Sequence, residues 1–316
     1  MRPEIAGVLD EIEKAVAGKR PVIEKILTAM LAGGHVLLDD VPGVGKTTLA
    51  VALSRAVGLR FQRVQFTPDV LPSDLVGFSM YDQAAGGFRY HAGALTNANL
   101  VLGDEINRAA SKTQSALLEA MEERQLTVDG NTYPLPDPFL VIATQNSVGA
   151  AGTQPLPYAQ MDRFLVRLSL GYPDHAAQMA MLRARQDADP LEQVACALTA
   201  EGLRALQRQA RAVSARDEVL DYITRLTFAT REDSRLEVGV SPRGALFLDH
   251  MAKAHACMEG RDYVTGADVQ AVFIDVCAHR VVLRDQSVTA AQALGDVLKR
   301  VENPDRQGGL KGLLKR

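Results

Sequence analysis

Glycine residues, a lysine and two threonines follow a short apolar run near the N-terminal end of the chain. Residues 35–50 are HVLLDDVPGVGKTTLA, in which Gly45, Lys46 and Thr47 stand where a helical pattern begins. Successive backbone N–H groups at a helix start, aided by the helix dipole, bind phosphate. The segment therefore predicts a phosphate-binding loop in which Lys46 reaches the β and γ phosphates of ATP and the Thr47 hydroxyl binds Mg²⁺. An ordinary glycine turn before a helix is the alternative.

The loop departs from the usual pattern G-x-x-x-x-G-K-[ST] at its first position, where Asp40 replaces glycine. Asp40 precedes the N–H groups that would hold phosphate, and Pro42 has no N–H to donate. The missing glycine thus removes backbone freedom at the start of the loop rather than a phosphate contact. We expect the Asp40 carboxylate to turn away from the phosphates.

Two acids and an amide end later apolar runs. NLVLGDEINRA, residues 99–109, leaves a buried-strand pattern at Asp104 and Glu105, and FLVIATQN ends at Asn146. Adjacent carboxylates at the end of an apolar strand indicate a bound cation. We expect Asp104 to hold Mg²⁺, Glu105 to act as general base toward water and Asn146 to orient that water. For the acidic pair, a plain helix cap is the alternative.

The pattern of elements changes once along the chain. Residues 1–171 alternate short apolar runs with helical periods, which predicts an α/β core with a parallel sheet flanked by helices. The expected strands are 36–38, 63–66, 100–102 and 139–143, and a helix is expected at 47–57 with Gly58 as its cap. Residues 172–316 carry only the helical period and predict a smaller all-helical lid domain, with helices in 176–186, 200–212, 219–230 and 244–258.

Composition excludes several classes of protein. The 316 residues are 47% hydrophobic with a net charge of −3, which is typical of a globular protein and opposes a basic nucleic-acid-binding surface. Neither a signal peptide nor a stretch long enough to span a bilayer is recognisable, so we expect a cytoplasmic protein without membrane insertion. The three cysteines lack C-x-x-C spacing and predict reduced thiols.

Histidine and cysteine gather in the last third of the chain. Their spacings do not match known zinc motifs, so we expect buried or surface helix residues, with a metal site as the alternative. The residues concerned are His250, His255, Cys257, Cys277 and His279.

The motifs above, together with FTPDVLPSDLVG, PLPYAQMDRF and GVSPRG, resemble those of the MoxR-type AAA+ ATPases. The resemblance covers about residues 18–172 and resumes at 241–243 and 263–269. It implies that Asn146 is the sensor 1 residue, Arg163 the arginine finger and Arg243 the sensor 2 residue. It also implies ATP and Mg²⁺ as cofactors and a ring, usually a hexamer, in which Arg163 reaches the nucleotide of the next subunit. The expected nucleotide contacts are Pro42, Gly43, Val44, Gly45, Lys46, Thr47, Thr48 and Asp104.

The chain departs from its relatives just before Arg163. Such proteins usually carry proline after the sensor asparagine, then acidic residues, and glutamate before Ala-Gln. Here these positions hold Ser147, Gly149, Ala151 and Tyr158. Because this segment leads to Arg163, the interface that presents the finger is expected to be rearranged.

Two glycine-containing turns predict hairpins, at residues 73–94 and 126–135. The first resembles the family's helix-2 insert. The hairpins are expected either to contact a client or only to close local cores.

Three functions remain open at this point. The first is a motor that hydrolyses ATP to remodel or mature a partner protein complex; resemblance implies a chaperone-like role, commonly with a partner containing a von Willebrand factor A domain. The second is a nucleotide-stabilised scaffold ring with little hydrolysis. The third, a nucleic-acid translocase, is opposed by the net acidity.

Overall fold

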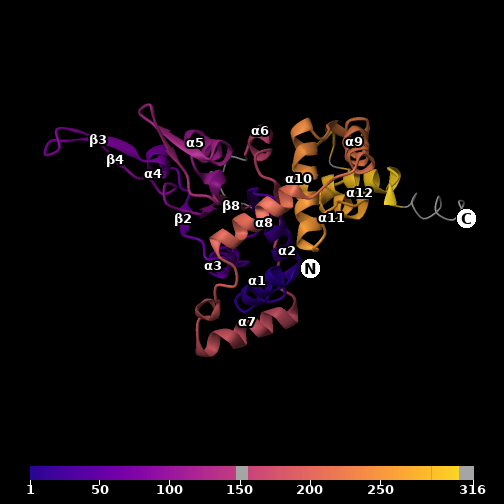
Figure 1. Ribbon diagram of the computed structural model, residues 1–316, viewed down its shortest axis with the longest axis horizontal. Helices are drawn as coiled ribbons and strands as arrows, with labels where there is room; N and C mark the ends of the chain where they lie inside the picture. Colours follow the sequence, from indigo (N-terminus) through magenta and orange to yellow (C-terminus); the bar gives the residue numbers. More distant parts are fainter. Residues whose placement is uncertain (147–155, 286, 306–316) are drawn as a thin grey trace, which may run out of the picture.

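Figure 1 shows the computed structural model, which describes residues 1–146, 156–285 and 287–305. Its centre is a five-stranded parallel sheet with the strand order β2-β5-β8-β1-β9. The predicted parallel α/β core is confirmed, and β9 is a strand that the sequence patterns did not indicate. The strands are β1 (Val36–Asp39), β2 (Phe61–Gln65), β5 (Leu100–Asp104), β8 (Leu140–Gln145) and β9 (Val166–Leu168).

Helices cover the sheet. Strand β5 lies between β2 and β8 and is buried along its whole length, which explains its unbroken apolar run. Helix α3 ends before Gly58, whose φ of +58° is the left-handed conformation expected of a C-terminal cap. The helices of this part are α1 (Pro3–Glu13), α2 (Arg20–Leu31), α3 (Lys46–Ala56), α4 (Pro72–Val76), η1 (Ile106–Arg108), α5 (Ser111–Glu123) and α6 (Tyr158–Met161).

The rest of the chain is the predicted helical lid. It also contains a short antiparallel pair, β10 (Leu236–Val238) with β11 (Val282–Leu283). One hydrophobic cluster includes residues of α1, α2 and α10, so lid helices pack directly on the first helices of the core. The division at residues 171 and 172 stays a prediction. The lid helices are α7 (His175–Asp187), η2 (Pro190–Gln193), α8 (Ala200–Ala212), α9 (Asp217–Arg231), α10 (Pro242–Met258), α11 (Gly266–Cys277) and α12 (Ala290–Arg300).

Both predicted hairpins are present. The first pairs β3 (Phe78–Asp82) with β4 (Gly87–His91), and the second pairs β6 (Gln125–Val128) with β7 (Asn131–Pro134). Figure 1 shows that the β3–β4 hairpin projects well beyond the sheet. Tyr90 and Tyr133 stack with their ring centroids 4.0 Å apart, which ties the two hairpins together near their bases.

All three cysteines are free, as predicted. The histidines of the lid have separate partners: His255 pairs with Asp268, and His279 contacts the backbone carbonyl of Phe164. Within the described ranges, no group of three or more His, Cys, Asp or Glu side chains is placed to hold a metal ion. None of the helices placed there is both long and apolar enough to cross a membrane.

Candidate functional site

The loop between β1 and α3 has the backbone that phosphate binding needs. Gly43 and Gly45 have φ values of +83° and +94°, a conformation that only glycine adopts readily. A Cβ added to either residue would meet nothing within 4 Å, so the loop faces open space. Helix α3 begins at Lys46 immediately after it, which directs the first N–H groups of the helix toward that space.

Lys46 lies at the centre of the site and is only 8% exposed. Its Nζ donates to Asn146 Oδ1 at 2.8 Å and to the backbone carbonyls of Asp40 and Gln145 at 3.1 and 3.4 Å. Burial lowers the pKa of Lys46, and the nearby carboxylates of Asp40 and Asp104 partly offset this effect. These contacts hold the ammonium group at the end of β8, beside the loop.

The Asp40 carboxylate turns away from the loop, which confirms the expectation from the sequence. Its Oδ2 accepts hydrogen bonds from the backbone N–H of Leu170, from that of Gly171 at 3.0 Å and from Ser169 Oγ at 3.1 Å. Asp40 therefore holds the start of the phosphate loop against residues 169–171, which follow β9. The acid at the first loop position has a structural partner of its own, in a place where glycine could provide none.

Asp104 and Glu105 end β5 beside the loop. The Asp104 carboxylate accepts hydrogen bonds from Thr144 Oγ1 and from Arg63, each at 2.7 Å. The backbone N–H of Glu105 donates to the same Thr144 Oγ1 at 2.9 Å. Glu105 has a φ of +57°, which costs a non-glycine residue about 1 kcal/mol or more. Thr144 thus fixes both acids at the point where the strand turns sharply.

Asn146 connects the lysine to the general-base candidate. Its Nδ2 donates to Glu105 Oε1 at 2.7 Å while its Oδ1 accepts from Lys46. The other carboxylate oxygen of Glu105 accepts from Arg108 at 2.7 Å. The ends of β1, β5 and β8 therefore bring one cation, one amide and one carboxylate into a single hydrogen-bonded chain.

These residues line one cavity of about 710 Å³, a size that suits a nucleotide. Every residue expected to contact nucleotide or Mg²⁺ lies on its wall, as do Glu105 and Asn146. The opposite wall comes from parts of the chain that the sequence motifs did not indicate. It consists of residues after α1 and residues on and before α7: Ala15, Val16, Ala17, Lys19, Tyr172, Pro173, Ala177, Gln178, Met181 and Arg185.

Arg163 and Arg243 do not line this cavity. They meet each other instead at Glu122, near the end of α5: Arg163 Nε lies 2.8 Å from Glu122 Oε2, and Arg243 Nη1 lies 3.1 Å from Glu122 Oε1. The hydrogen bond from Arg163 holds the pKa of Glu122 below its usual value. All three side chains are about one-third exposed, so the arginine pair lies on the surface.

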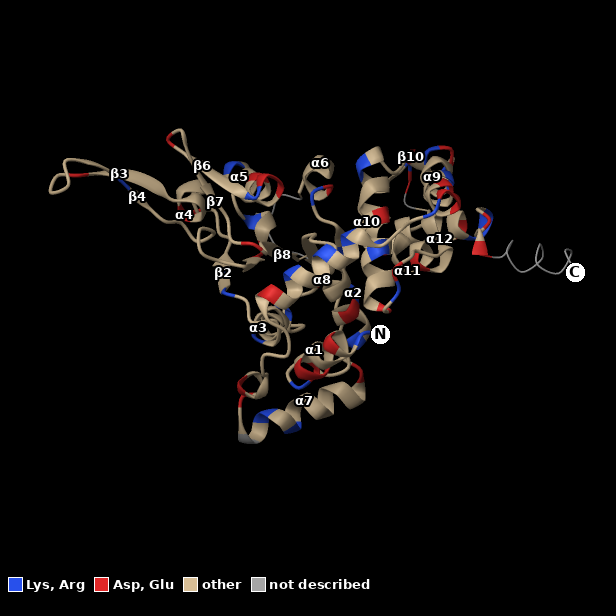
Figure 2. Ribbon diagram, viewed as in Figure 1, with Lys and Arg blue, Asp and Glu red and all other residues tan. Residues whose placement is uncertain are grey.

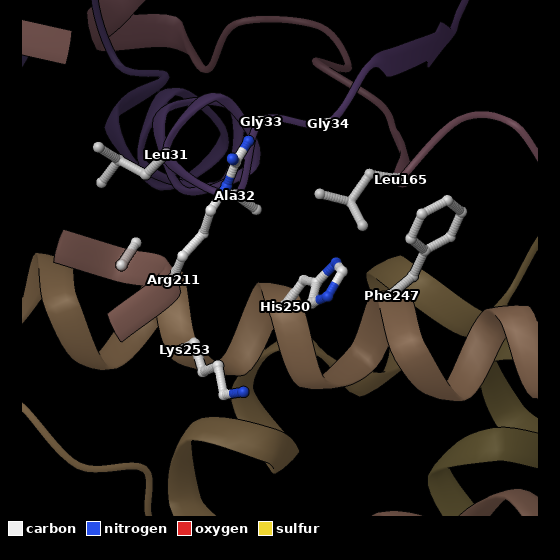
Figure 3. A pocket seen from close by; sticks show the side chains of 10 residues that line it. Leu31, Ala32, Gly33, Gly34, Leu165, Arg211, Phe247, His250 and Lys253 are labelled. Atoms are coloured by element: carbon white, nitrogen blue, oxygen red, sulfur yellow. The ribbon is translucent and has the colours of Figure 1, made fainter. Parts of the chain in front are cut away.

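A second cavity, of about 290 Å³, lies between α2, α8 and α10 (Figure 3). Its wall combines apolar side chains such as Leu31, Leu165 and Phe247 with the basic side chains of Arg211, His250 and Lys253. It contains none of the residues of the phosphate loop and neither Asp104 nor Glu105. The residues expected to bind nucleotide therefore line the larger cavity.

Several residues of the site were missed at the level of sequence. Thr144 was within reach, because it lies two residues before Asn146, and residues i and i+2 of a strand point to the same face. Arg63 was not within reach, because its contact with Asp104 depends on the pairing of β2 with β5, which places Gln65 opposite Asp104 and is visible only in the structure. Glu122 offered no signal, because an acidic residue near the end of a helix is usually solvated.

Comparisons with known proteins agree with this geometry. Residues 35–166 match the ATPase family associated with various cellular activities (AAA), and residues 228–300 match the AAA lid domain. The uncharacterized protein YeaC of Bacillus subtilis is 41% identical over 98% of both chains. Chaperone MoxR1 of Mycobacterium tuberculosis is 40% identical over 86% of this chain and 74% of its own length. Protein MoxR of Methylorubrum extorquens is 33% identical over 92% of this chain and 91% of its own length.

A crystal structure agrees as well. A protein from Cytophaga hutchinsonii assigned as an ATPase superimposes with a TM-score of 0.86 at 37% identity, over 95% of this chain and 94% of its own. At this coverage the similarity extends over both the sheet and the lid, and the family match over residues 35–166 includes Lys46, Asp104 and Asn146. The chain belongs to the MoxR-type AAA+ ATPases.

Proposed function

We propose that the protein hydrolyses ATP within a homo-oligomeric ring, a hexamer in the usual form, and uses this cycle to remodel or mature a partner protein complex in the cytoplasm. The convergence of Lys46, Asn146 and Glu105 in one nucleotide-sized cavity is the observation that carries the proposal. The three free cysteines fit a reducing compartment.

The residues of the cavity divide the work of binding. Backbone N–H groups of Gly43, Val44 and Gly45 cradle the phosphates, flanked by Pro42 and Thr48, and Lys46 neutralises their charge. Thr47 and Asp104 hold Mg²⁺, which when bound offsets charge on the β and γ phosphates. The Asp104 carboxylate fits this role because it is anchored by Thr144 and accepts a cationic partner already, the guanidinium of Arg63.

Glu105 is the general base of the proposal and Asn146 orients the attacking water. Asn146 and Arg108 each donate to one oxygen of Glu105, and the carboxylate has further lone pairs with which to accept a proton from water. The Glu105→Gln variant should therefore bind ATP as the parent does and turn it over at least about a hundredfold more slowly. Equal turnover of the two proteins would favour the scaffold ring instead.

Arg163 and Arg243 are proposed to act together on the nucleotide of a neighbouring subunit. Neither lines the cavity of its own chain, and both point to the surface at Glu122. An arginine supplied by a neighbour can raise the rate of phosphoryl transfer roughly a thousandfold or more, because it stabilises charge on the equatorial oxygens. The Arg163→Ala variant should keep ATP binding and lose most turnover.

Mixing variants tests whether the arginines act across the interface. Arg163→Ala subunits have intact cavities, and Glu105→Gln subunits have intact arginines. If Arg163 acts on a neighbour, a mixture of the two inactive proteins regains turnover; if it acts on its own cavity, the mixture stays as slow as its components. Arg243→Ala replaces Arg163→Ala in a parallel experiment.

The scaffold ring remains a second candidate because one observation favours it. Both oxygens of Glu105 already accept hydrogen bonds, from Asn146 and Arg108, so an attacking water must compete for the remaining lone pairs. Of the departures from the family before Arg163, Ser147, Gly149 and Ala151 lie outside the described residues. Tyr158 is described, and its hydroxyl donates to the backbone carbonyl of Arg280.

The β3–β4 hairpin is the proposed contact for the client, a protein such as one with a von Willebrand factor A domain. Its large apolar side chains Phe78, Met80, Tyr81 and Phe88 are 48%, 53%, 55% and 79% exposed, in a part of the fold that projects from the body (Figure 1). A pull-down with Glu105→Gln and ATP should capture the partner, and the same pull-down with Phe88→Ser added should not. Equal capture by both proteins would remove the hairpin from the proposal.

A further inference from the structure

Arg280 is a charged residue in an unusual place. It follows α11, and its side chain is completely buried, at 0% exposure. Removing a guanidinium from water costs several kcal/mol, and well-packed apolar residues often serve stability equally well at such positions. Burial of Arg280 therefore needs a reason beyond packing.

The hydrogen bonds of Arg280 surround the residue that carries the arginine-finger assignment. Its Nε donates to Asp162 Oδ1 at 2.8 Å, and its two terminal nitrogens donate to the backbone carbonyls of Asp162 at 3.0 Å, Phe164 at 2.5 Å and Leu165 at 3.1 Å. These carbonyls lie immediately before and after Arg163. A single guanidinium from the lid thus holds the backbone on both sides of Arg163, while the side chain of Arg163 reaches out to Glu122.

Two further contacts join the same two segments. His279 Nε2 lies 3.0 Å from the carbonyl oxygen of Phe164, and the hydroxyl of Tyr158 donates to the carbonyl of Arg280. The segment before β9 is therefore joined to the end of α11 at three successive points. Its position depends on where the lid lies.

Arg280 also reaches Arg243, through Phe247 and Asp162. The Phe247 ring contacts two guanidinium groups: its centroid lies 4.8 Å from Cζ of Arg280 and 5.4 Å from Cζ of Arg243, which is cation–π geometry for both. Asp162 gives one oxygen to Arg280, and its other oxygen lies 3.9 Å from Arg243 Nε. Arg280 therefore contacts residues that hold Arg163 and residues that hold Arg243.

We propose that Arg280 is a positioning residue that locks Arg163 and Arg243 into one rigid pair and ties the reach of that pair to the position of the lid. The inference rests on the proposed function, in which these two arginines act on the nucleotide of a neighbour. A planar fork with several donors is needed, because the acceptors come from one side chain and several backbone carbonyls in different directions. A lysine ammonium in the same place can serve only part of this set.

The Arg280→Lys variant tests the inference. We expect the KM for ATP to stay within about threefold of the parent value, since Arg280 does not line the nucleotide cavity, and kcat to fall at least about tenfold, toward the value of Arg163→Ala. Arg261→Lys is the matched control: Arg261 is a lid arginine that pairs with Asp268, remote from Arg163 in its contacts, and its variant should keep the parent kcat.

A mixing experiment separates positioning from a general defect of the fold. Arg280→Lys subunits should have sound cavities and poorly placed arginines, so mixing them with Glu105→Gln subunits should restore turnover. A merely structural role predicts no rescue, because the cavities of the Arg280→Lys subunits would be impaired as well. Absence of rescue overturns the inference.

Two further measurements keep the test decisive. If Arg280→Lys does not fold, Asp162→Asn takes its place, because it keeps an acceptor oxygen but removes the charge shared by Arg280 and Arg243. This variant should give the same loss of kcat and the same rescue. Turnover equal to that of the parent in Asp162→Asn refutes the inference. Arg163→Ala is assayed in parallel. Parent turnover in Arg163→Ala contradicts the proposed function, whereas slow Arg163→Ala with a fast Arg280→Lys contradicts the positioning role alone.

Discussion

Asp40 offers a direct test of how the loop tolerates an acid at its first position. In the Asp40→Gly variant, the N–H groups of Leu170 and Gly171 and the hydroxyl of Ser169 lose their common acceptor. Leu170 is buried, so its N–H has no route to water. A hydrogen bond to a charged group contributes about 1.5–3 kcal/mol. With two backbone donors affected, we expect the free energy of unfolding to fall by about 3–6 kcal/mol.

Nucleotide affinity should respond far less to the same change. The carboxylate points toward the segment after β9 and away from the phosphate loop, so we expect the Kd for Mg-ATP, measured by calorimetry, to change by less than about tenfold, or about 1.4 kcal/mol. Urea unfolding provides the free energy of unfolding. Asp40→Ala controls for the backbone freedom that glycine adds, and Asp40→Asn, which keeps one acceptor oxygen, should lie between parent and alanine variant.

Two results would refute this reasoning. An increase of ATP affinity beyond about tenfold in Asp40→Gly would mean that the carboxylate repels the phosphates after all. Unfolding free energies of Asp40→Gly and Asp40→Ala within about 0.5 kcal/mol of the parent would mean that the contacts with Leu170 and Gly171 carry no weight.

Three other perturbations have expected outcomes. Lys46→Ala should abolish the heat of Mg-ATP binding, and heat equal to that of the parent would contradict the placement of the nucleotide. His35 donates to the carbonyl of Met121 and accepts from the N–H of Val141, and burial lowers its pKa to about 3. Below about pH 6.5 the unfolded chain binds a proton at His35 that the folded chain does not, so the free energy of unfolding should decrease by up to about 1.4 kcal/mol for each unit that the pH falls from about 6.5 to about 3. His35→Gln should flatten this slope in urea unfolding at a series of pH values. Arg63→Ala frees one oxygen of Asp104, the proposed Mg²⁺ ligand at the end of β5, so half-maximal turnover should need less Mg²⁺. Stability should change by less than about 1 kcal/mol, as expected for a half-exposed ion pair. A higher Mg²⁺ requirement would show that Arg63 supports metal binding.

Many residues of the larger cavity were predictable from the sequence because they lie at or just after the ends of strands. Parallel strands leave the sheet at one edge, so polar residues after successive apolar runs had to meet there. Asp104, Glu105 and Asn146 were identified in this way, and the structure joins Asn146 to both Glu105 and Lys46. The length of α8, residues 200–212, was likewise predicted to the residue by its helical period.

The charge pattern of the surface was not predictable in the same manner. Figure 2 shows acidic and basic residues mixed over most of the molecule, in keeping with the net charge of −3. Within this mixture, Glu122 on α5 forms ion pairs with both Arg163 and Arg243, although nothing near it in the sequence distinguishes it from the other acids of that helix.

By itself, the sequence determined the local chemistry of this protein: glycines where the backbone must turn with positive φ, a lysine at a helix start, and acids and an amide where apolar strands end. These features depend on neighbours within a few residues, so their periodicity and spacing are visible in the chain. Only the tertiary structure decided what Asp40 binds, which helix closes the cavity and how Arg280 holds the segment of Arg163. Those contacts join residues more than a hundred positions apart, and they depend on how helices pack after they form, for which a linear pattern carries no signal.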